Sequence, residues 1–168
     1  TSGGRDAAEV ARAGGEVDGV RLPKEAYYVC RAMFDARDPQ VHIIGHWTYP
    51  AGTKKTIYVA CNRGSVELFV KGKSLGFGKP DPDGPYIFLF KDVVWEPGEI
   101  KAVAIADGKM VATHTLRTAG PAVALRMTSI DNPNGGLVAD GSDILLINVE
   151  AVDAKGERCP TFQQRVDF

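Results

Sequence analysis

Short apolar runs dominate the chain from Val41 onward, and each alternates with polar positions and ends at a turn-forming residue. Such runs predict β-strands, because every second side chain of a strand points to the same face. We predict strands at residues 41–47, 56–61, 65–71, 86–91, 99–106 and 110–117. Six strands within about 75 residues, with turn signals about every ten residues, are typical of an immunoglobulin-like β-sandwich.

The residues between these runs favour tight turns. The sequences Lys71-Gly72-Lys73 and Asp107-Gly108 each contain a glycine that can adopt positive φ in a hairpin. Residues 81–85 (DPDGP) are unsuited to a continuous strand. The chain therefore contains a residue-level cause for the end of each predicted strand.

Alternation within the strands predicts the core. Val66, Leu68 and Val70 share one face of their strand, and Glu67 and Lys71 share the other. We expect the first three to be buried, because one face of an antiparallel sheet commonly meets water. Residues 86–91 are apolar on both faces, and contact with a neighbouring domain would account for the second face.

One helix is predicted before the strands, at residues 23–34. Its apolar positions follow helical spacing, Pro23 suits the first helical position, and Glu25 in the first turn complements the helix dipole. The glycine-rich segment before it suggests an irregular connection. The helix needs a surface on which to pack.

A second β-unit begins at Gly120. Its predicted strands are residues 122–128 and 144–152 and a strand that starts at residues 163–168. Three strands are too few to close a sandwich. We therefore expect three parts: residues 1–39 with one helix, a sandwich at residues 40–118, and an incomplete second immunoglobulin-like module at residues 119–168. Both ends look cut, so we expect a fragment of a larger protein.

Composition agrees with an all-β protein. The 168 residues include 19 Gly and 10 Pro, which suit short strands and tight turns. Twenty Lys and Arg residues balance 21 Asp and Glu residues to a net charge of −1, so we expect no nucleic-acid or membrane partner. No apolar run approaches the roughly 20 residues that span a bilayer.

The candidate chemistry is sparse. His42 and His46 share a strand face, but no third ligand lies at a telling distance, so we expect exposed strand histidines and no metal site. The acidic pairs Glu16/Asp18 and Asp81/Asp83 lie in Gly- or Pro-rich stretches and are expected to be solvated loops. Cys30 and Cys61 are expected to be small buried apolar residues, and none of the three cysteines has the spacing of a disulfide framework. We predict no catalytic residue and no cofactor.

Aromatic side chains gather at one strand end, in the sequence His46-Trp47-Thr48-Tyr49-Pro50. Trp47 and Tyr49 either cap the sandwich core or an interdomain seam, or stack on sugar rings. Both interpretations stay open at this point.

Several sequence strings together resemble bacterial glycoside hydrolase family 2 enzymes of the β-galactosidase type. Residues 16–31 (EVDGVRLPKEAYYVCR) and 41–47 (VHIIGHW) are similar to the junction between the last helix of the catalytic barrel and an immunoglobulin-like domain. That domain's strings resemble residues 57–62, 65–76 and 95–103, and the start of the next module resembles residues 120–125, 139–143 and 149–156. Cys61 and Lys71 depart from the pattern, which has a polar residue and the Asn of an Asn-Gly hairpin there.

The resemblance implies that residues 1–39 are the tail of a catalytic barrel and that the catalytic glutamates lie outside this chain. It also implies a parent enzyme that hydrolyses β-galactosides or related sugars, in the periplasm or outside the cell. We expect a non-catalytic module that buttresses the barrel, with the barrel and neighbouring immunoglobulin-like modules of the same polypeptide as partners. The alternatives are a carbohydrate-binding module that uses Trp47 and Tyr49, and an autonomous hydrolase, for which no paired-carboxylate site is evident.

Overall fold

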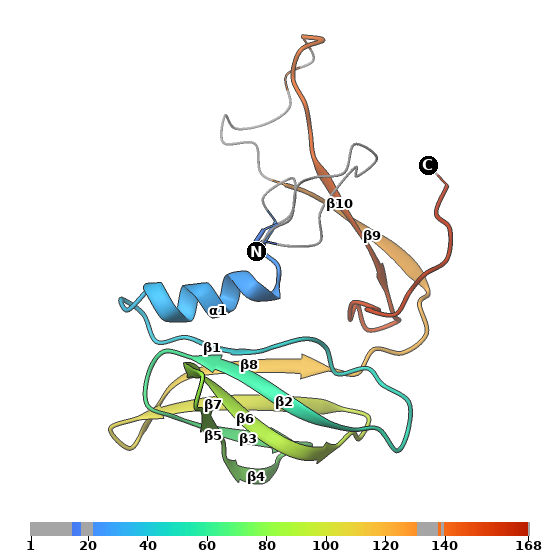
Figure 1. Ribbon diagram of the computed structural model, residues 1–168. Coiled ribbons are helices and arrows are strands. Elements are labelled where there is room, and N and C mark those ends of the chain that lie inside the picture. Colours follow the sequence, from blue (N-terminus) through green and yellow to red (C-terminus); the bar gives the residue numbers. More distant parts are fainter. Residues whose placement is uncertain (1–14, 18–21, 131–137, 139, 168) are drawn as a thin grey trace, which may run out of the picture.

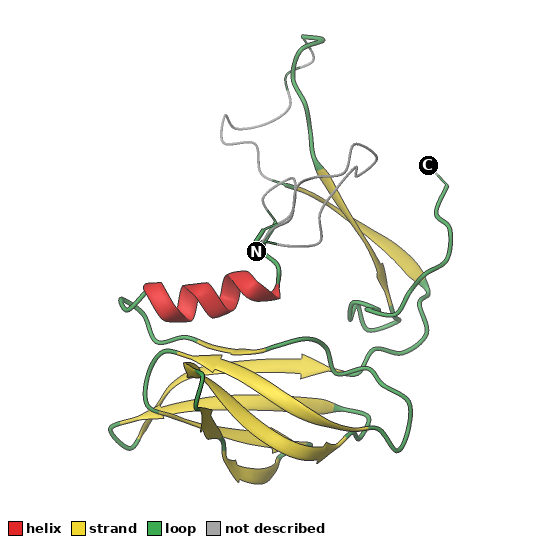
Figure 2. Cartoon of the chain, in the orientation of Figure 1, coloured by secondary structure: helices red, strands yellow, loops and turns green. Residues whose placement is uncertain are grey.

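The computed structural model describes residues 15–17, 22–130, 138 and 140–167, and its main body is a sandwich of two four-stranded antiparallel sheets (Figures 1 and 2). The β1 sheet has the order β1 (Val41–Ile43), β2 (Lys54–Cys61), β6 (Gly84–Val94) and β5 (Lys79–Asp81). The β8 sheet has the order β4 (Lys73–Phe77), β3 (Ser65–Val70), β7 (Glu99–Ala106) and β8 (Lys109–Arg117). The predicted all-β, immunoglobulin-like sandwich is confirmed.

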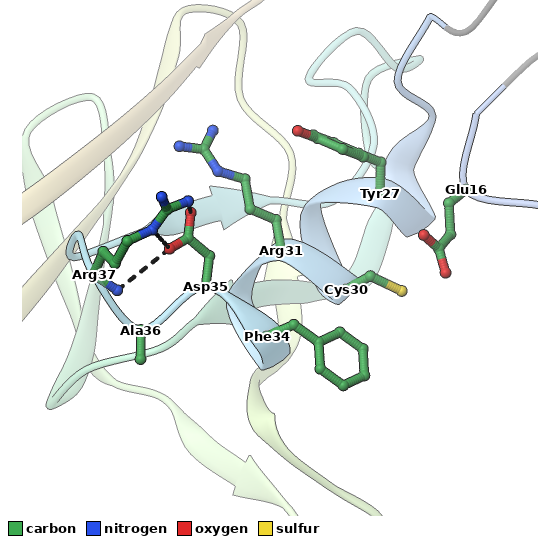
Figure 3. Close-up of a pocket in the computed structure, with 8 residues that line it drawn as sticks. All are labelled: Glu16, Tyr27, Cys30, Arg31, Phe34, Asp35, Ala36 and Arg37. Atoms are coloured by element: carbon green, nitrogen blue, oxygen red, sulfur yellow. Dashed lines mark hydrogen bonds and ion pairs between the residues drawn. The ribbon is translucent and has the colours of Figure 1, made fainter.

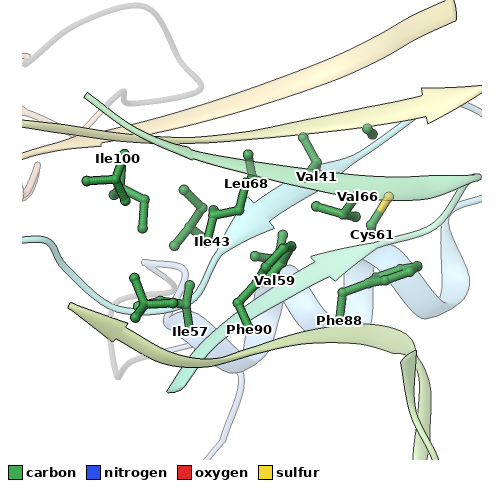
Figure 4. Close-up of a cluster of buried hydrophobic side chains, with 14 of the residues drawn as sticks. Val41, Ile43, Ile57, Val59, Cys61, Val66, Leu68, Phe88, Phe90 and Ile100 are labelled. Carbon is green, nitrogen blue, oxygen red and sulfur yellow. The ribbon is translucent and has the colours of Figure 1, made fainter. Parts of the chain in front are cut away.

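The core lies between the two sheets, where the labelled side chains of Figure 4 point toward one another. Val66, Leu68 and Val70 are buried, as the alternation predicted. In β6 the inner face carries Phe88 and Phe90, which resolves the choice that periodicity left open. Full burial of one such side chain contributes about 1.5–3 kcal/mol, so these alternating positions account for much of the sandwich's stability.

Several strand boundaries differ from prediction. β1 ends at Ile43 and not at Trp47, because Gly45 leaves the strand conformation with φ +100°. The edge strands β4 and β5 were not predicted. β6 runs from Gly84 to Val94, longer than the predicted 86–91, and includes a bulge at Lys91 and Asp92 opposite β2.

Helix α1 (Glu25–Phe34) starts two residues later than predicted. Lys24 is its N-cap, and Pro23 pairs instead with Val17 in an isolated antiparallel bridge. Glu25 lies in the first turn, as expected from the helix dipole.

Helix α1 packs on the outer face of the β1 sheet, where it contacts β1, β2 and β6. His42, Ala60 and Ile87 are in register across these strands and point away from the core. Ala60 is nevertheless buried, as is Ala32 of the helix. The helix therefore covers part of the second apolar face of β6, for which the sequence suggested a neighbouring domain.

The second unit is a two-stranded antiparallel sheet of β9 (Ala124–Ser129) and β10 (Ile147–Val152), which stands apart from the sandwich in Figure 1. Its apolar residues Leu125, Met127 and Ile147 are exposed. The third strand predicted at residues 163–168 is wrong for residues 163–167, which form no strand, and Phe168 lies outside the described residues. The predicted boundaries of the three parts stay predictions.

Candidate interaction surface on helix α1

Four side chains fasten α1 to the sandwich, and we call Glu25, Tyr28, His42 and His114 the anchor cluster. His42 points out of the β1 sheet because its neighbours Val41 and Ile43 fill the core. Its Nε2 lies 2.9 Å from Oε2 of Glu25 on the helix, and the same oxygen accepts a hydrogen bond from the Gly45 amide at 3.1 Å. One carboxylate of the helix thus bonds both a side chain and the backbone just beyond β1.

Three rings of the anchor cluster form a column. The Tyr28 ring stacks on His42 with centroids 3.9 Å apart and planes 9° apart, and His42 stacks on His114 at 4.4 Å and 26°. His114 belongs to β8, and its Nδ1 accepts a hydrogen bond of 2.9 Å from the Ile43 amide. The column therefore connects the helix to edge strands of both sheets.

Burial sets the protonation of His114. It lowers the pKa of this imidazole to about 4, with a further contribution from the His42 charge that Glu25 partly offsets. The neutral ring carries its proton on Nε2, because Nδ1 accepts the Ile43 amide hydrogen. Burial alone would raise the pKa of Glu25, but the hydrogen bonds from His42 and Gly45 outweigh it and leave that pKa lowered.

The outer side of α1 carries a shallow open hollow of about 800 Å³ (Figure 3). Tyr27, Cys30 and Phe34 line it from the helix, and Cys30 points toward Glu16 of the preceding segment. The hydrogen bond with Glu16 and partial burial raise the pKa of the Cys30 thiol. The Phe34 side chain is 82% exposed, an unfavourable position for an apolar ring unless another surface covers it.

Trp47 lies inside the sandwich. It is 1% exposed, and its indole Nε1 donates a hydrogen bond of 3.1 Å to the Glu96 carbonyl. Its own carbonyl accepts hydrogen bonds from Trp95 Nε1 and Thr118 Oγ1. Trp47 thus secures the point where β8 leaves the sandwich, and its ring has no exposed face for a sugar.

Tyr49 is partly exposed but already engaged. Its ring stacks on His46 at 4.3 Å, Lys55 Nζ lies 4.1 Å from the ring centroid, and Lys55 also donates a hydrogen bond to the phenolic oxygen. Sugar binding through Tyr49 stays a prediction.

The remaining candidates have structural explanations. The expectation of an exposed strand histidine is wrong for His42, because α1 covers it. Asp81 accepts a hydrogen bond from the Asp83 amide and stabilises the β5–β6 turn, whereas Asp18 lies outside the described residues. Of the two cysteines expected to be buried, Cys61 is buried and Cys30 is only partly covered.

In the described part of the chain, no three His, Cys, Asp or Glu side chains are grouped so as to hold a metal ion. None of its helices has the length and apolar character needed to cross a membrane.

Sequence reasoning missed Glu25 and His114 as interacting residues. Glu25 was interpreted only through the helix dipole, and His114 lies in an alternating strand with no local peculiarity. Their contacts join residues 17 and 71 positions apart, and no pattern within a single element reports such pairs.

Comparison with known proteins shows that the chain is similar to short segments of larger proteins. A family described as "Domain of unknown function (DUF4982)" matches residues 52–112. The chain is 53% identical over 166 residues to a protein named Beta-glucuronidase from Formosa agariphila, a match covering 99% of this chain and 17% of that protein. It is 35% identical over 156 residues to Beta-galactosidase BoGH2A from Bacteroides ovatus, covering 92% of this chain and 18% of that protein.

A solved structure is also similar to this chain. The structure of a β-glucuronidase from glycoside hydrolase family 2 matches with a TM-score of 0.81 and 52% identity, over 89% of this chain and 15% of that one. The chain therefore spans less than a fifth of each of these three proteins.

Proposed function

We propose that this chain, which corresponds to a segment of glycoside hydrolase family 2 enzymes, is a non-catalytic region that buttresses the catalytic barrel of its parent polypeptide. In this proposal residues 1–39 are the tail of the barrel, residues 40–118 the supporting sandwich, and residues 119–168 part of a further module. The observation that carries the proposal is that one side of α1 is bonded to the sandwich while the opposite side exposes apolar side chains.

The inner side of α1 is fixed to the sandwich. Glu25 is hydrogen-bonded by His42 and by the Gly45 amide, and the stacked rings of the anchor cluster reach β8. A hydrogen bond to a charged group contributes about 1.5–3 kcal/mol when it is shielded from water, and less at a partly exposed carboxylate such as Glu25. The helix and the sandwich therefore act as one support.

The outer side of α1 is suited to a second surface. Phe34 and Met33 are exposed on the helix, and Tyr27 and Cys30 line the adjoining hollow. Covering such a ring contributes about 1.5–3 kcal/mol, which favours docking against a larger domain. A barrel of the same polypeptide is the partner that the resemblance to family 2 enzymes supplies.

The parent enzyme is proposed to hydrolyse β-glucuronides, because the relative at 53% identity bears the name Beta-glucuronidase. β-Galactosides are the other substrate class to be assayed, since a relative at 35% identity is named for them. We place the parent in the periplasm or outside the cell.

The decisive variant is Phe34→Asp in the full-length parent enzyme. We expect it to lower the melting temperature and to speed proteolysis between the barrel and this region. In the isolated 168-residue chain the same change should leave the melting temperature unaltered, because the ring is 82% exposed there. Met110→Asp is the matched control, since Met110 is an exposed apolar residue of β8 that lies outside the α1 hollow.

Two results would overturn the proposal. One is equal behaviour of the Phe34→Asp and Met110→Asp enzymes. The other is hydrolysis of nitrophenyl β-glucuronide or β-galactoside by the isolated chain. Retardation of the chain in a galactan or xylan gel, lost on Tyr49→Ala, would instead establish the carbohydrate-binding alternative.

A further inference from the structure

A second groove, with a volume of about 490 Å³, lies between β4 and the end of β6. Its volume falls within the roughly 300–1,000 Å³ of ligand clefts. It shares no lining residue with the hollow on α1, and β4 lies at the opposite side of the sandwich from α1 in Figure 1. Docking through α1 would therefore leave this groove accessible.

The groove exists because β5 is too short to cover the sandwich edge. β5 pairs with β6 only as far as Leu89, so residues 90–94 have β2 on one side and no described strand on the other. Across the gap, Lys73 of β4 pairs with Val70 and therefore lies on the same, core-facing side of the sheet. Leu75 of β4 also lines the groove. An apolar slot is left open at this edge.

Apolar and cationic groups are combined around the slot. Phe77 is 60% exposed, and Leu75 and Val94 are also exposed. The lining includes three exposed lysines, Lys73, Lys79 and Lys91, and no ion pair joins any of them to another described residue.

Two carboxylates also line the groove, but they do not cancel its positive charge. Glu96 is paired with Lys71 at 3.7 Å, which leaves Asp92 against three lysines. Charge complementarity therefore favours an anionic occupant with apolar faces.

The edge of β6 argues against an extended peptide as that occupant. Asp92 adopts φ +56° in the bulge at Lys91 and Asp92, which interrupts the regular edge to which a strand would add. Bulges and edge lysines are devices by which proteins prevent strand addition. A sugar needs no regular strand edge, because its C–H faces pack on rings such as Phe77 and its acid groups meet ammonium groups.

We infer that the groove between β4 and β6 binds an oligosaccharide that contains uronic acid residues, with carboxylates on Lys73, Lys79 and Lys91 and a sugar face on Phe77. The choice of uronate among anionic sugars rests on the proposed β-glucuronide specificity of the parent enzyme. The groove would hold an acidic polymer while the barrel cleaves it elsewhere.

The test is titration of the ¹⁵N-labelled 168-residue chain with three probes: a glucuronate oligomer, a sulfated galactan oligomer and a neutral galactan oligomer. We expect the glucuronate oligomer to bind and to shift the amide resonances of residues 73–79 and 89–94. Added salt should weaken this binding, because it screens the lysine charges.

Charge variants sharpen the test. Lys79→Glu combined with Lys91→Glu should lower affinity about tenfold, and Phe77→Ala about three- to tenfold. Asp92→Asn should raise affinity, because it removes the carboxylate that repels the ligand. Lys109→Glu is the matched control: Lys109 is an exposed lysine in the β7–β8 hairpin, outside the groove, and its reversal should leave affinity unchanged.

The inference fails if the glucuronate oligomer does not bind, if the groove variants bind as well as the Lys109→Glu control, or if the sulfated or the neutral galactan oligomer binds in its place. A separate assay of the full-length enzyme on nitrophenyl β-glucuronide tests the proposed substrate. Cleavage without groove binding would reject the groove and keep the proposed function, whereas groove binding without β-glucuronide cleavage would reject only the proposed substrate.

Discussion

His114 makes the stability of the sandwich dependent on pH. Burial lowers its folded-state pKa to about 4 from the ordinary 6.5, so between these values the unfolded chain holds a proton that the folded chain does not. Stability is therefore complete above pH 6.5 and falls as the pH is lowered toward 4. We expect a loss of about 1–2 kcal/mol between pH 7 and pH 4.5, after allowing for solvent screening of this partly exposed ring.

The variant His114→Asn should remove most of this dependence. Asparagine offers an oxygen near the place of Nδ1 for the Ile43 amide and does not titrate. Urea unfolding between pH 7 and pH 4.5, followed by fluorescence of Trp47 and Trp95, measures the difference. If the unfolding free energy fell equally with pH in both proteins, the assignment of this dependence to His114 would be contradicted. The pKa of Glu25 is also lowered, but Glu25 contributes to the pH dependence only below about pH 4.5.

At the scale of single residues, the alternation of apolar and polar positions predicted the core, but contacts between residues far apart in the sequence could not be predicted. Val66, Leu68 and Val70 could be assigned to the core because a half-buried strand has a period of two. The same reasoning made His42 an exposed strand residue, since it points away from that core. Nothing local indicates that a helix 17 residues earlier in the chain covers this face.

Among the elements, the β3–β4 hairpin contains an unfavourable residue. Its two-residue turn, Lys71-Gly72, has positive φ at both positions, +50° and +78°. Asparagine and aspartate tolerate this conformation better than lysine does. We expect Lys71→Asn to stabilise the chain by about 0.5–1 kcal/mol, because the exposed Lys71–Glu96 pair that it removes contributes little.

The β7–β8 hairpin provides the control for this prediction. Its turn, Asp107-Gly108, has nearly the same geometry, with φ +52° and +70°, and already contains a favourable residue. Asp107→Asn should therefore change the urea midpoint little, whereas Lys71→Asn should raise it with an unchanged slope. A lower midpoint for Lys71→Asn would show that its pairing and packing outweigh the turn geometry.

Long strands and strong turns were predictable from the sequence, and short edge elements were not. β7 matches its prediction because an apolar-rich run of eight residues lies between two clear turns. β4 and β5 contain Lys, Ser, Gly, Pro and Asp, which carry little strand preference, and the proline of β5 fits an edge strand because it has no N–H to donate. The same shortness leaves the groove open, so neither the groove nor its lysines could be recognised from the sequence.

In the whole molecule, the start of the second unit is held by hydrogen bonds of its own Asp153 and by an ion pair to the end of β8. The Asp153 carboxylate accepts hydrogen bonds from the amides of Gly120, Lys155 and Glu157 at 2.8–2.9 Å, and Arg117 pairs with Glu157 at 3.6 Å. The Gly120 bond above all lowers the pKa of Asp153, with burial opposing. The ionised Asp153 therefore stabilises the folded chain at neutral pH, and this stabilisation is lost only as the pH falls through the lowered pKa.

The sequence indicated where this second unit begins but not how far it is ordered. β9 and β10 pair over six positions, close to two of the predicted strands. The third prediction failed because alternation over residues 163–167 is too short to form a strand without a partner to pair with. The exposed Leu125, Met127 and Ile147 agree with a sheet that requires further strands for burial.

Asp153→Ala should release the second unit while the sandwich stays intact. Loss of three amide hydrogen bonds, one of which reaches Gly120 at the connection, frees the chain between β8 and β9. We expect amide hydrogen exchange at residues 119–129 to accelerate about tenfold, with the amides of β7 unchanged. Asp140→Ala is the matched control, because Asp140 stabilises a turn by bonding Ser142 and Asp143 but does not reach the connection. Equal exchange in the two variants would mean that Arg117 and the backbone, and not Asp153, hold the two units together.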